Sequence, residues 1–593
     1  MPTKSSRAER SDLPNRILFI AISAFLAASC ARVVPKPSLG LGEGDTKWVE
    51  QTLRRMTLEE KIGQMISCRY SGNFYSADSD DLARLRGLVV DLKIGGLIIF
   101  LGDAYETAHL NNALQSMAKI PLLIASDLER GAGTQITGAT LFPTLMGIGA
   151  TNSEELAFHM GRITAEEGRA LGIHQTYAPV VDVNINPDNP IINTRAIGED
   201  PEQVSRLGAA FIRGCQGGGM IATAKHFPGH GDTDQDSHSL LPTINADMER
   251  LERVELYPYK KCMEAGVQSI MVTHLYVPAL DPTPGLPSSL SQVILTELLR
   301  KKMGFSGIIV TDAMEMGGVA NTYTSTEAAL KSILAGVDVV LLPPEPEKVA
   351  AFLIDAAKSG RLPEPRIDES VRRILEAKAR LGLNLNRFVD VDALPEKLGT
   401  KENLRWAEAA FESAATLVKN EGDVLPIASA GRKISVFSLS SDAGDYFAGR
   451  AFAEAVRRRS PGTQIFYGDA TSGKEALESA FMKTAGSDLI ICAIFSSLRA
   501  AKGSVGLVAN HADMIKTLAA TGKPVVVVNF GSPYLLKNFP EVAGYLCLYR
   551  NTPIAQDIAA RAIFGELEAK GKLPVSLPGL FPLGYGLELK KIK

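Results

Sequence analysis

The segment MIATAKHFPGHGDTDQDSHSLLP, residues 220–242, decides which fold the chain is expected to adopt. Its first eight residues form a nearly continuous apolar run, as a parallel strand covered on both faces requires. Lys225 and His226 stand near the end of this run, and a loop rich in His, Asp and Gly follows directly. A buried strand that leads polar side chains into a long loop is typical of barrel enzymes, which assemble their sites at strand ends.

The same pattern recurs on both sides of this segment. The other apolar runs are IGQMISC (62–68), GGLIIF (95–100), PLLIASD (121–127), YAPVVDV (177–183), SIMVTH (269–274), GIIVTD (307–312) and GVDVVLL (336–342). The segments between them, such as residues 153–171, show the 3.6-residue apolar period of amphipathic helices. Eight strand–helix units over about 300 residues predict an N-terminal (β/α)8 TIM-like barrel, which we assign to residues 31–385.

Polar side chains follow the carboxyl ends of several predicted strands. They are Asp127, Asp182, Lys225, His226, His274 and Asp312. A single Asp at such a position could simply cap the next helix. Because two His and a Lys accompany the carboxylates, the set instead indicates a site at the mouth of the barrel.

A second domain is expected after a polar linker at residues 386–403. Residues 404–593 predict an open α/β sandwich domain. Its candidate strands are KISVFSL (433–439), TQIFYG (463–468), DLIICAIF (488–495), KPVVVVNF (523–530) and VAGYLCLY (542–549). No Gly-rich phosphate-binding loop follows any of these strands in the sequence, so we expect no nucleotide cofactor.

Composition excludes further classes of protein. The chain has 593 residues, 45% hydrophobic and 22% charged, with a formal net charge of −3. These values are ordinary for globular domains, and no basic stripe indicates nucleic-acid binding. Apart from Cys30, the five Cys are widely spaced, which favours buried free thiols over a disulfide framework.

The first 30 residues are expected to be an export signal. Four basic residues precede an apolar run at residues 17–28, which is too short to span a membrane. The run ends in Leu26-Ala27-Ala28-Ser29-Cys30, which resembles a bacterial lipobox. We therefore expect a periplasmic or cell-envelope protein that is lipid-anchored to the membrane at Cys30, with a plain cleaved signal as the alternative.

The loop after residue 227 allows three interpretations. Its Asp and His side chains could bind a metal ion, but a calcium loop needs Gly and an acidic residue where this chain has Ser237 and Thr243. A solvated acidic loop is the second interpretation. The third is acid/base catalysis, because Asp236 and His238 share one side of an extended segment. Asp236 would then orient the imidazole, whose other nitrogen exchanges a proton.

KHFPGHGDT (225–233), with DSH (236–238) just downstream, resembles the signature of glycoside hydrolase family 3 β-N-acetylglucosaminidases. The resemblance covers nearly all of the chain after the export signal and indicates a two-domain, exported form. ERGAGTQ (129–135) departs from the EGG-type continuation common in the family. Other segments similar to family motifs are MTLEEKIGQM (56–65), SDLERG (126–131), NTRAIGEDP (193–201), VTDAMEM (310–316), ATLVKNEGDVLPI (415–427) and KPVVVVNFGSPY (523–534).

The resemblance implies a role for each matching residue. Asp312 would be the nucleophile of a retaining reaction, His238 the acid/base, and Asp236 the group that orients His238. The residues implied to bind the sugar are Asp127, Arg195, Lys225 and His226. His274, at another strand end, either lines the site as a further substrate-binding residue or packs in the core.

The expected activity is hydrolysis of terminal non-reducing β-linked GlcNAc, from peptidoglycan fragments or chitooligosaccharides, through a covalent glycosyl-enzyme intermediate. One alternative is a phosphorylase, because a neutral His does not repel an incoming phosphate. The other is a non-catalytic lipoprotein that binds muropeptides. We expect a monomer that binds carbohydrate and uses no cofactor, no metal and no nucleic acid.

Overall fold

The computed structural model describes residues 40–427, 431–496 and 506–592. The predicted export signal and Cys30 lie outside these residues. Within the described part of the chain, no helix combines the length and apolarity needed to cross a membrane. The other cysteines are buried free thiols, as expected: Cys68, Cys215, Cys262, Cys492 and Cys547.

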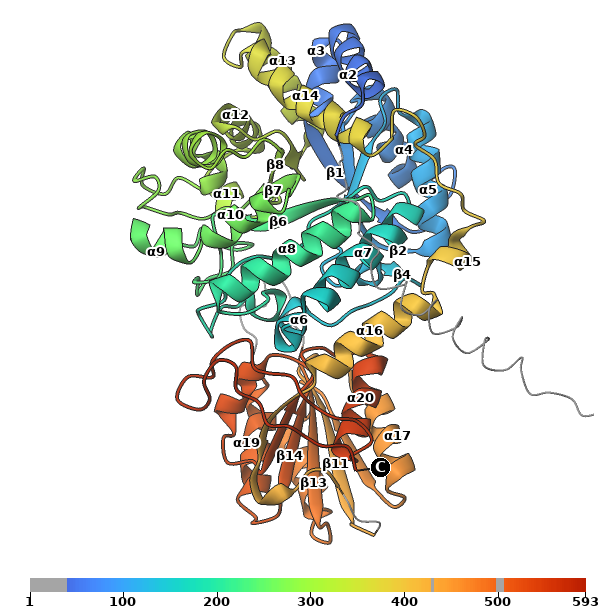
Figure 1. The fold of residues 1–593 in the computed structure, drawn as a ribbon, viewed down its shortest axis with the longest axis vertical. Helices are drawn as coiled ribbons and strands as arrows, with labels where there is room; N and C mark the ends of the chain where they lie inside the picture. The colour runs from blue at the N-terminus through green and yellow to red at the C-terminus, as the bar shows by residue number, and fades with distance from the viewer. Residues whose placement is uncertain (1–39, 428–430, 497–505, 593) are drawn as a thin grey trace, which may run out of the picture. The chain divides into compact units, whose positions relative to one another are not determined.

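Parallel strands form the sheet of the first domain (Figure 1). Eight of those described follow the order β8-β7-β6-β5-β3-β2-β1-β9, and a bridge between Val310 and Val339 brings the two ends together. The predicted TIM-like barrel is therefore confirmed. The strands are β1 (Ile66–Gly72), β2 (Gly96–Asp103), β3 (Leu123–Ser126), β5 (Gln175–Thr176), β6 (Ile221–Phe227), β7 (Ser269–Val272), β8 (Ile308–Thr311) and β9 (Val340–Leu341), with β4 (Ile136–Thr137) beside β2.

Helices lie around these strands (Figure 1). Their starts follow from capping residues: Ser153 accepts a hydrogen bond from Leu156 N, and Asp200 accepts one from Gln203 N. Their apolar stripes pack on the barrel and bury the core. The principal helices are α2 (Glu43–Arg55), α3 (Leu58–Gln64), α4 (Asp80–Arg86), α5 (Ala104–Met117), α6 (Leu145–Thr151), α7 (Glu154–Ala170), α8 (Pro201–Gly217), α9 (Met248–Arg253), α10 (Tyr257–Glu264), α12 (Ser325–Ala335), α13 (Pro346–Lys358) and α14 (Glu364–Arg380).

Two predicted strands differ in the structure. Residues 62–64 end helix α3, because Thr57 and Glu60 form a reciprocal capping box that starts a helix at Leu58, and strand β1 begins only at Ile66. In the predicted strand at 177–183, regular pairing stops after Thr176. Pro179 has no N–H to donate, and a single bridge from Val180 to Lys225 continues the pairing.

The second domain has a mixed sheet of order β10-β15-β14-β13-β11-β12. Strand β10 is antiparallel to β15, the remaining pairs are parallel, and hydrophobic clusters fill both faces. The predicted α/β sandwich is thus confirmed. Its elements are β10 (Thr416–Asn420), β11 (Ile434–Ser440), β12 (Gln464–Gly468), β13 (Leu489–Phe495), β14 (Val525–Asn529) and β15 (Gly544–Cys547), with α17 (Arg450–Arg459), α18 (Lys474–Met482), α19 (Ala509–Ala519) and α20 (Pro553–Ile563).

Hydrogen bonds join the second domain to the barrel. Lys572 N donates to Ala150 O at 3.0 Å, and Glu199 N donates to Pro574 O at 3.0 Å. Asn184 Nδ2 donates to the Tyr534 hydroxyl at 3.1 Å. These bonds fix loops of the second domain beside the carboxyl ends of the barrel strands.

Candidate active site

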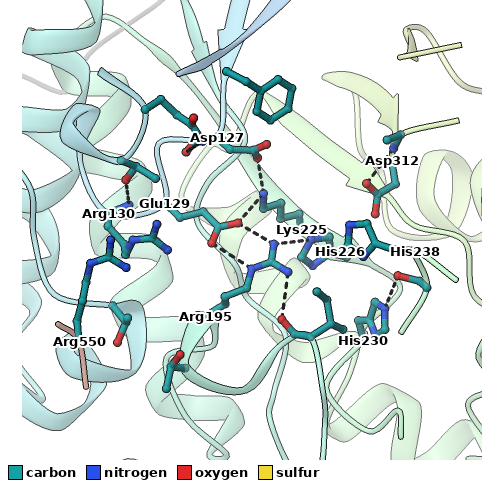
Figure 2. Close-up of a pocket in the computed structure, with 18 of the residues that line it drawn as sticks. Asp127, Glu129, Arg130, Arg195, Lys225, His226, His230, His238, Asp312 and Arg550 are labelled. Atoms are coloured by element: carbon teal, nitrogen blue, oxygen red, sulfur yellow. Dashed lines mark hydrogen bonds and ion pairs between the residues drawn. The ribbon is translucent and has the colours of Figure 1, made fainter. Parts of the chain in front are cut away.

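Asp312 lies directly after strand β8, at the mouth of the barrel (Figure 2). Thr273 Oγ1 donates to its Oδ2 at 2.8 Å, and Ala313 N donates to its Oδ1 at 2.9 Å. Burial alone would raise the pKa of Asp312, but His226, His274 and these hydrogen bonds outweigh burial and hold the pKa below its usual range. The carboxylate is therefore ionised at neutral pH, as a nucleophile must be.

His238 is oriented by Asp236, as the sequence predicts. His238 Nδ1 lies 2.7 Å from Asp236 Oδ1, and the same oxygen accepts a hydrogen bond from His238 N at 2.9 Å. Asp236 is buried, whereas the His238 side chain is 35% exposed and lines the cavity. With Nδ1 bound to the carboxylate, Nε2 is the nitrogen that can exchange a proton with a ligand.

The loop that carries His238 docks on the segment that follows Asp312. Gly317 N donates to His238 O at 2.9 Å, and Gly318 N donates to Ser237 O at 3.1 Å. A Cβ at position 317 would lie 2.4 Å from Ser239 O, so glycine is required for this approach. The candidate acid/base is thereby held on the backbone that follows the candidate nucleophile, and Figure 2 shows both side chains at one end of the pocket.

His230 was not predicted as a site residue, yet it connects the loop to the barrel. Its backbone N donates to Asp182 Oδ1 at 2.7 Å, and its Nδ1 lies 2.8 Å from Thr233 Oγ1. Its Nε2 lies 2.9 Å from Ser237 Oγ. Burial lowers the pKa of His230 to about 4, so the ring is neutral at pH 7. The spacing of Asp236 and His238 predicts a catalytic pair, but nothing in the local sequence indicates that His230 supports this loop.

Four charged side chains form a compact cluster beside Asp312. Lys225 Nζ lies 2.7 Å from Asp127 Oδ1 and 2.8 Å from Glu129 Oε1. Arg195 binds Glu129 through two nitrogens, Nη2 to Oε1 at 2.7 Å and Nε to Oε2 at 3.1 Å. Burial opposes charge on Glu129, but Arg195 and Lys225 hold its pKa well below the usual range. The structure thus brings together three predicted residues and adds Glu129, which was quoted in a motif but assigned no role.

His226 completes the floor of the pocket. Its Nδ1 lies 2.7 Å from Asp182 Oδ2, and its Nε2 lies 3.2 Å from Arg195 Nη2. Asp182 is buried and also accepts hydrogen bonds from the backbone N–H groups of His226 and His230. Asp182, which was not predicted to bind the sugar, thus holds His226 and His230 in place through hydrogen bonds.

His274 supports the nucleophile and does not line the cavity. Its Nδ1 lies 2.7 Å from Ser289 Oγ, and its Nε2 lies 3.1 Å from Ala313 O. The side chain is fully buried, and burial lowers the pKa of His274. Because Ser289 and Ala313 occupy both ring nitrogens, neither nitrogen faces a sugar. Of the two alternatives predicted for His274, the structure favours packing in the core beside Asp312.

The cavity above these residues has a volume of about 1030 Å³. Both domains line it, and the second domain contributes residues that follow its parallel strands. Ligand crevices outside the carboxyl ends of parallel strands are usual in open α/β sheets, so the same rule that located the barrel site could have indicated them. The contributing residues are Asp442, Asp445, Phe495, Ser496, Phe530, Gly531, Ser532, Tyr549, Arg550 and Asn551.

Comparisons with known proteins agree with this architecture. A β-N-acetylglucosaminidase/β-glucosidase from Cellulomonas fimi is 30% identical over 557 residues, covering 90% of this chain and 96% of the relative. The structure of a family 3 β-N-acetylglucosaminidase from Paenibacillus sp. str. FPU-7 superposes with a TM-score of 0.79 at 31% identity, covering 88% of this chain and 99% of that one. The β-glucoside phosphorylase BglX superposes with a TM-score of 0.82 at 27% identity, covering 92% and 98%.

The family models give the same assignment for each domain. The glycosyl hydrolase family 3 N terminal domain matches residues 57–377, and the glycosyl hydrolase family 3 C-terminal domain matches residues 415–580. The barrel and the sandwich thus each correspond to one domain of the same family. The chain belongs to glycosyl hydrolase family 3 and is a glycoside hydrolase.

Proposed function

We propose that this glycoside hydrolase is a retaining β-N-acetylhexosaminidase that removes terminal non-reducing β-linked GlcNAc. The observation that carries the proposal is the ionised Asp312 in one cavity with a histidine that Asp236 orients at 2.7 Å. The names of the relatives from Cellulomonas fimi and Paenibacillus support the sugar preference. Peptidoglycan fragments and chitooligosaccharides both carry such termini.

The proposed reaction has two steps. In the first, an Asp312 carboxylate oxygen attacks the anomeric carbon and the bond to the leaving oxygen breaks, while that oxygen takes a proton from His238 Nε2. In the second, His238 Nε2 removes a proton from water, which attacks the same carbon and releases Asp312. Two inversions give overall retention of configuration.

The charged cluster is suited to holding the sugar. Asp127 is the most exposed of its four members, with 28% of its side chain accessible, so its carboxylate can accept from sugar hydroxyls. Lys225 and Arg195 also line the cavity, and Asp127 and Glu129 together balance their charges. Hydrogen bonds that sugar hydroxyls donate to a carboxylate such as Asp127 strengthen as positive charge develops on the ring, and this lowers the barrier.

A panel of aryl β-glycosides tests the proposal on the chain expressed without its first 30 residues. We expect the highest kcat/KM for GlcNAc among GlcNAc, GalNAc, glucose and xylose, with the β-anomer as the first product by NMR. A preference for glucose, or an α-anomer formed first, would contradict it. Adding phosphate gives a second readout, since GlcNAc 1-phosphate would identify a phosphorylase instead.

We also propose that the protein is exported and anchored through Cys30. The basic residues, short apolar run and Ser29-Cys30 ending support this. Full-length protein should partition with membranes and incorporate a fatty-acid label, and Cys30→Ala should lose the label. Label retained in Cys30→Ala would overturn the anchor.

A further inference from the structure

Two arginines in the cavity form no ion pair with any carboxylate that the structure describes. Arg130 follows strand β3 in the barrel, and Arg550 follows strand β15 in the second domain. Both line the cavity, and the Nε atom of each is buried without a hydrogen-bond partner in residues 40–427, 431–496 and 506–592. Among the described residues, neither guanidinium makes an ion pair, in contrast to Arg195 and Lys225.

The ion-pair cluster next to Arg130 and Arg550 has no excess negative charge to offset these two arginines. Asp127 and Glu129 are matched by their ion-pair partners Lys225 and Arg195. Arg130 and Arg550 therefore add two positive charges beside an ion-pair cluster that is already balanced, in a cavity that Asp442 and Asp445 also line. Burial and the neighbouring Arg130 together lower the pKa of Arg550 to about 9, while Glu129 acts in the opposite direction. The group remains charged at neutral pH, and two like charges so placed favour an anion between them.

Two hydroxyl groups of the second domain are suited to the same kind of ligand. Ser496 Oγ and Ser532 Oγ are buried and have no hydrogen-bond partner in the described part of the chain, and both residues line the cavity. A Cβ on Gly531 would lie 2.7 Å from Ser496 Oγ, so this glycine leaves the hydroxyl room. Hydroxyl and guanidinium donors together match the acceptor oxygens of a carboxylate or phosphate.

We infer that Arg130 and Arg550 form an oxyanion-binding site that takes a carboxylate or phosphate group. Figure 2 shows both arginines on the opposite side of Glu129 and Arg195 from Asp312. If Asp312 faces the anomeric carbon, which rests on the proposed function, the anion is an acidic substituent on the far end of the sugar. Free inorganic phosphate is the other source of the same chemistry. An anion held there cannot be the group that attacks the anomeric carbon.

Binding of inorganic phosphate to the full-length protein tests the site without any turnover. In calorimetric titration at constant ionic strength, we expect saturable binding that Arg130→Gln and Arg550→Gln each weaken about tenfold or more, as loss of a charged hydrogen-bonding partner predicts. Arg550→Lys should also weaken binding, because it keeps the charge but loses the planar fork. Arg54→Gln, at an exposed arginine of α2, should leave binding unchanged. No saturable phosphate binding by the wild type, or unchanged affinity in Arg130→Gln/Arg550→Gln with a native melting curve, overturns the site.

Kinetics on acidic sugars separate the two sources. Aryl β-GlcNAc should be compared with its 6-phosphate and with an aryl β-glucuronide. A tenfold greater loss of kcat/KM on an acidic substrate than on the neutral one in Arg550→Gln supports a sugar-borne anion. Equal losses, together with phosphate binding that depends on the arginines, support free phosphate as the ligand. If no glycoside is cleaved at all, the proposed function fails while the titration still decides the oxyanion site.

Discussion

His230 and Ser237 are joined by a 2.9 Å contact between Nε2 and Oγ, which anchors the loop carrying His238 to the barrel. The Thr233 hydroxyl donates to His230 O at 3.3 Å, so its oxygen is left to accept from His230 Nδ1–H. With the ring proton on Nδ1, Nε2 accepts from the Ser237 hydroxyl. Ser237 lies between Asp236 and His238 in the sequence, so this hydrogen bond restrains the backbone that carries both side chains.

Ser237→Ala should reduce turnover without removing any proposed catalytic group. Loss of one hydrogen bond, worth about 1 kcal/mol, predicts a decrease of about fivefold in kcat on substrates with poor leaving groups. Ser239→Ala is the matched control, because Ser239 is exposed on the same loop. Steady-state kinetics on a GlcNAc disaccharide would measure both variants, and equal effects would contradict a positioning role for Ser237.

His238→Ala should discriminate between leaving groups. A general acid contributes about 10²–10⁴-fold, so hydrolysis of a disaccharide should fall by that factor. An activated aryl glycoside, whose phenolate leaves without a proton, should lose far less in its glycosylation step. Losses of the same size on both substrates would remove His238 from the acid role, and burst kinetics would show which step is affected.

Asp312→Asn should abolish turnover by roughly 10⁴-fold or more while keeping the shape of the side chain. Melting temperature should stay close to wild type if the loss is chemical. Wild type should also be labelled at Asp312 by a 2-deoxy-2-fluoro glycoside, detectable as a mass increase on the peptide that contains residue 312. Labelling at another residue would contradict the assignment.

The lowered pKa of His230 predicts a pH-dependent contribution to stability. Below pH 6.5 His230 binds a proton in the unfolded chain, whereas in the folded protein it stays neutral until about pH 4. The free energy of unfolding of wild type therefore decreases as pH falls from 6.5 to about 4. A shift from 6.5 to about 4 corresponds to roughly 3 kcal/mol. The difference in unfolding free energy between wild type and His230→Gln should shrink by that amount from pH 7.5 to pH 4. Urea unfolding measures it, and a constant difference would count against the prediction.

Gly231→Ala should damage the loop by a purely steric route. A Cβ at this position would lie 1.8 Å from Val183 O, so the backbone must move. We expect a destabilisation of about 1–3 kcal/mol and reduced activity. Gly486→Ala is the control, because a Cβ there would have no heavy atom within 4 Å. A Gly231→Ala enzyme with native stability and activity would show that the loop adapts freely.

The sequence predicted the barrel because its strands are buried on both faces and so appear as continuous apolar runs. Boundaries failed where local chemistry competes with hydrophobicity, as at the capping box of Thr57 and Glu60 and at Pro179. Strand β10 was missed, since its Thr, Lys and Asn side chains break the apolar pattern at an antiparallel edge.

Position at a strand end led correctly to the cavity for Asp127, Lys225, His226 and Asp312, because the barrel fixes where strand ends lie. Position at a strand end did not show that His274 differs from these residues, because its ring points toward Ser289 and not into the cavity. Nor could it pair Arg130 with Arg550, which stand 420 positions apart and meet only through the packing of two domains. Side-chain direction and inter-domain proximity are tertiary properties that no local pattern encodes.

The hydrogen bonds from Gly317 and Gly318 to the His238 loop have an evolutionary consequence. The proposed nucleophile Asp312 directly follows a barrel strand, whereas the proposed acid His238 lies on a loop that contacts the segment after Asp312 through main-chain oxygens of the loop. Main-chain contacts do not depend on which side chain the loop presents. Insertions and deletions could therefore change the length of this loop or exchange its proton donor during evolution. The barrel core and Asp312 would not need to change with it.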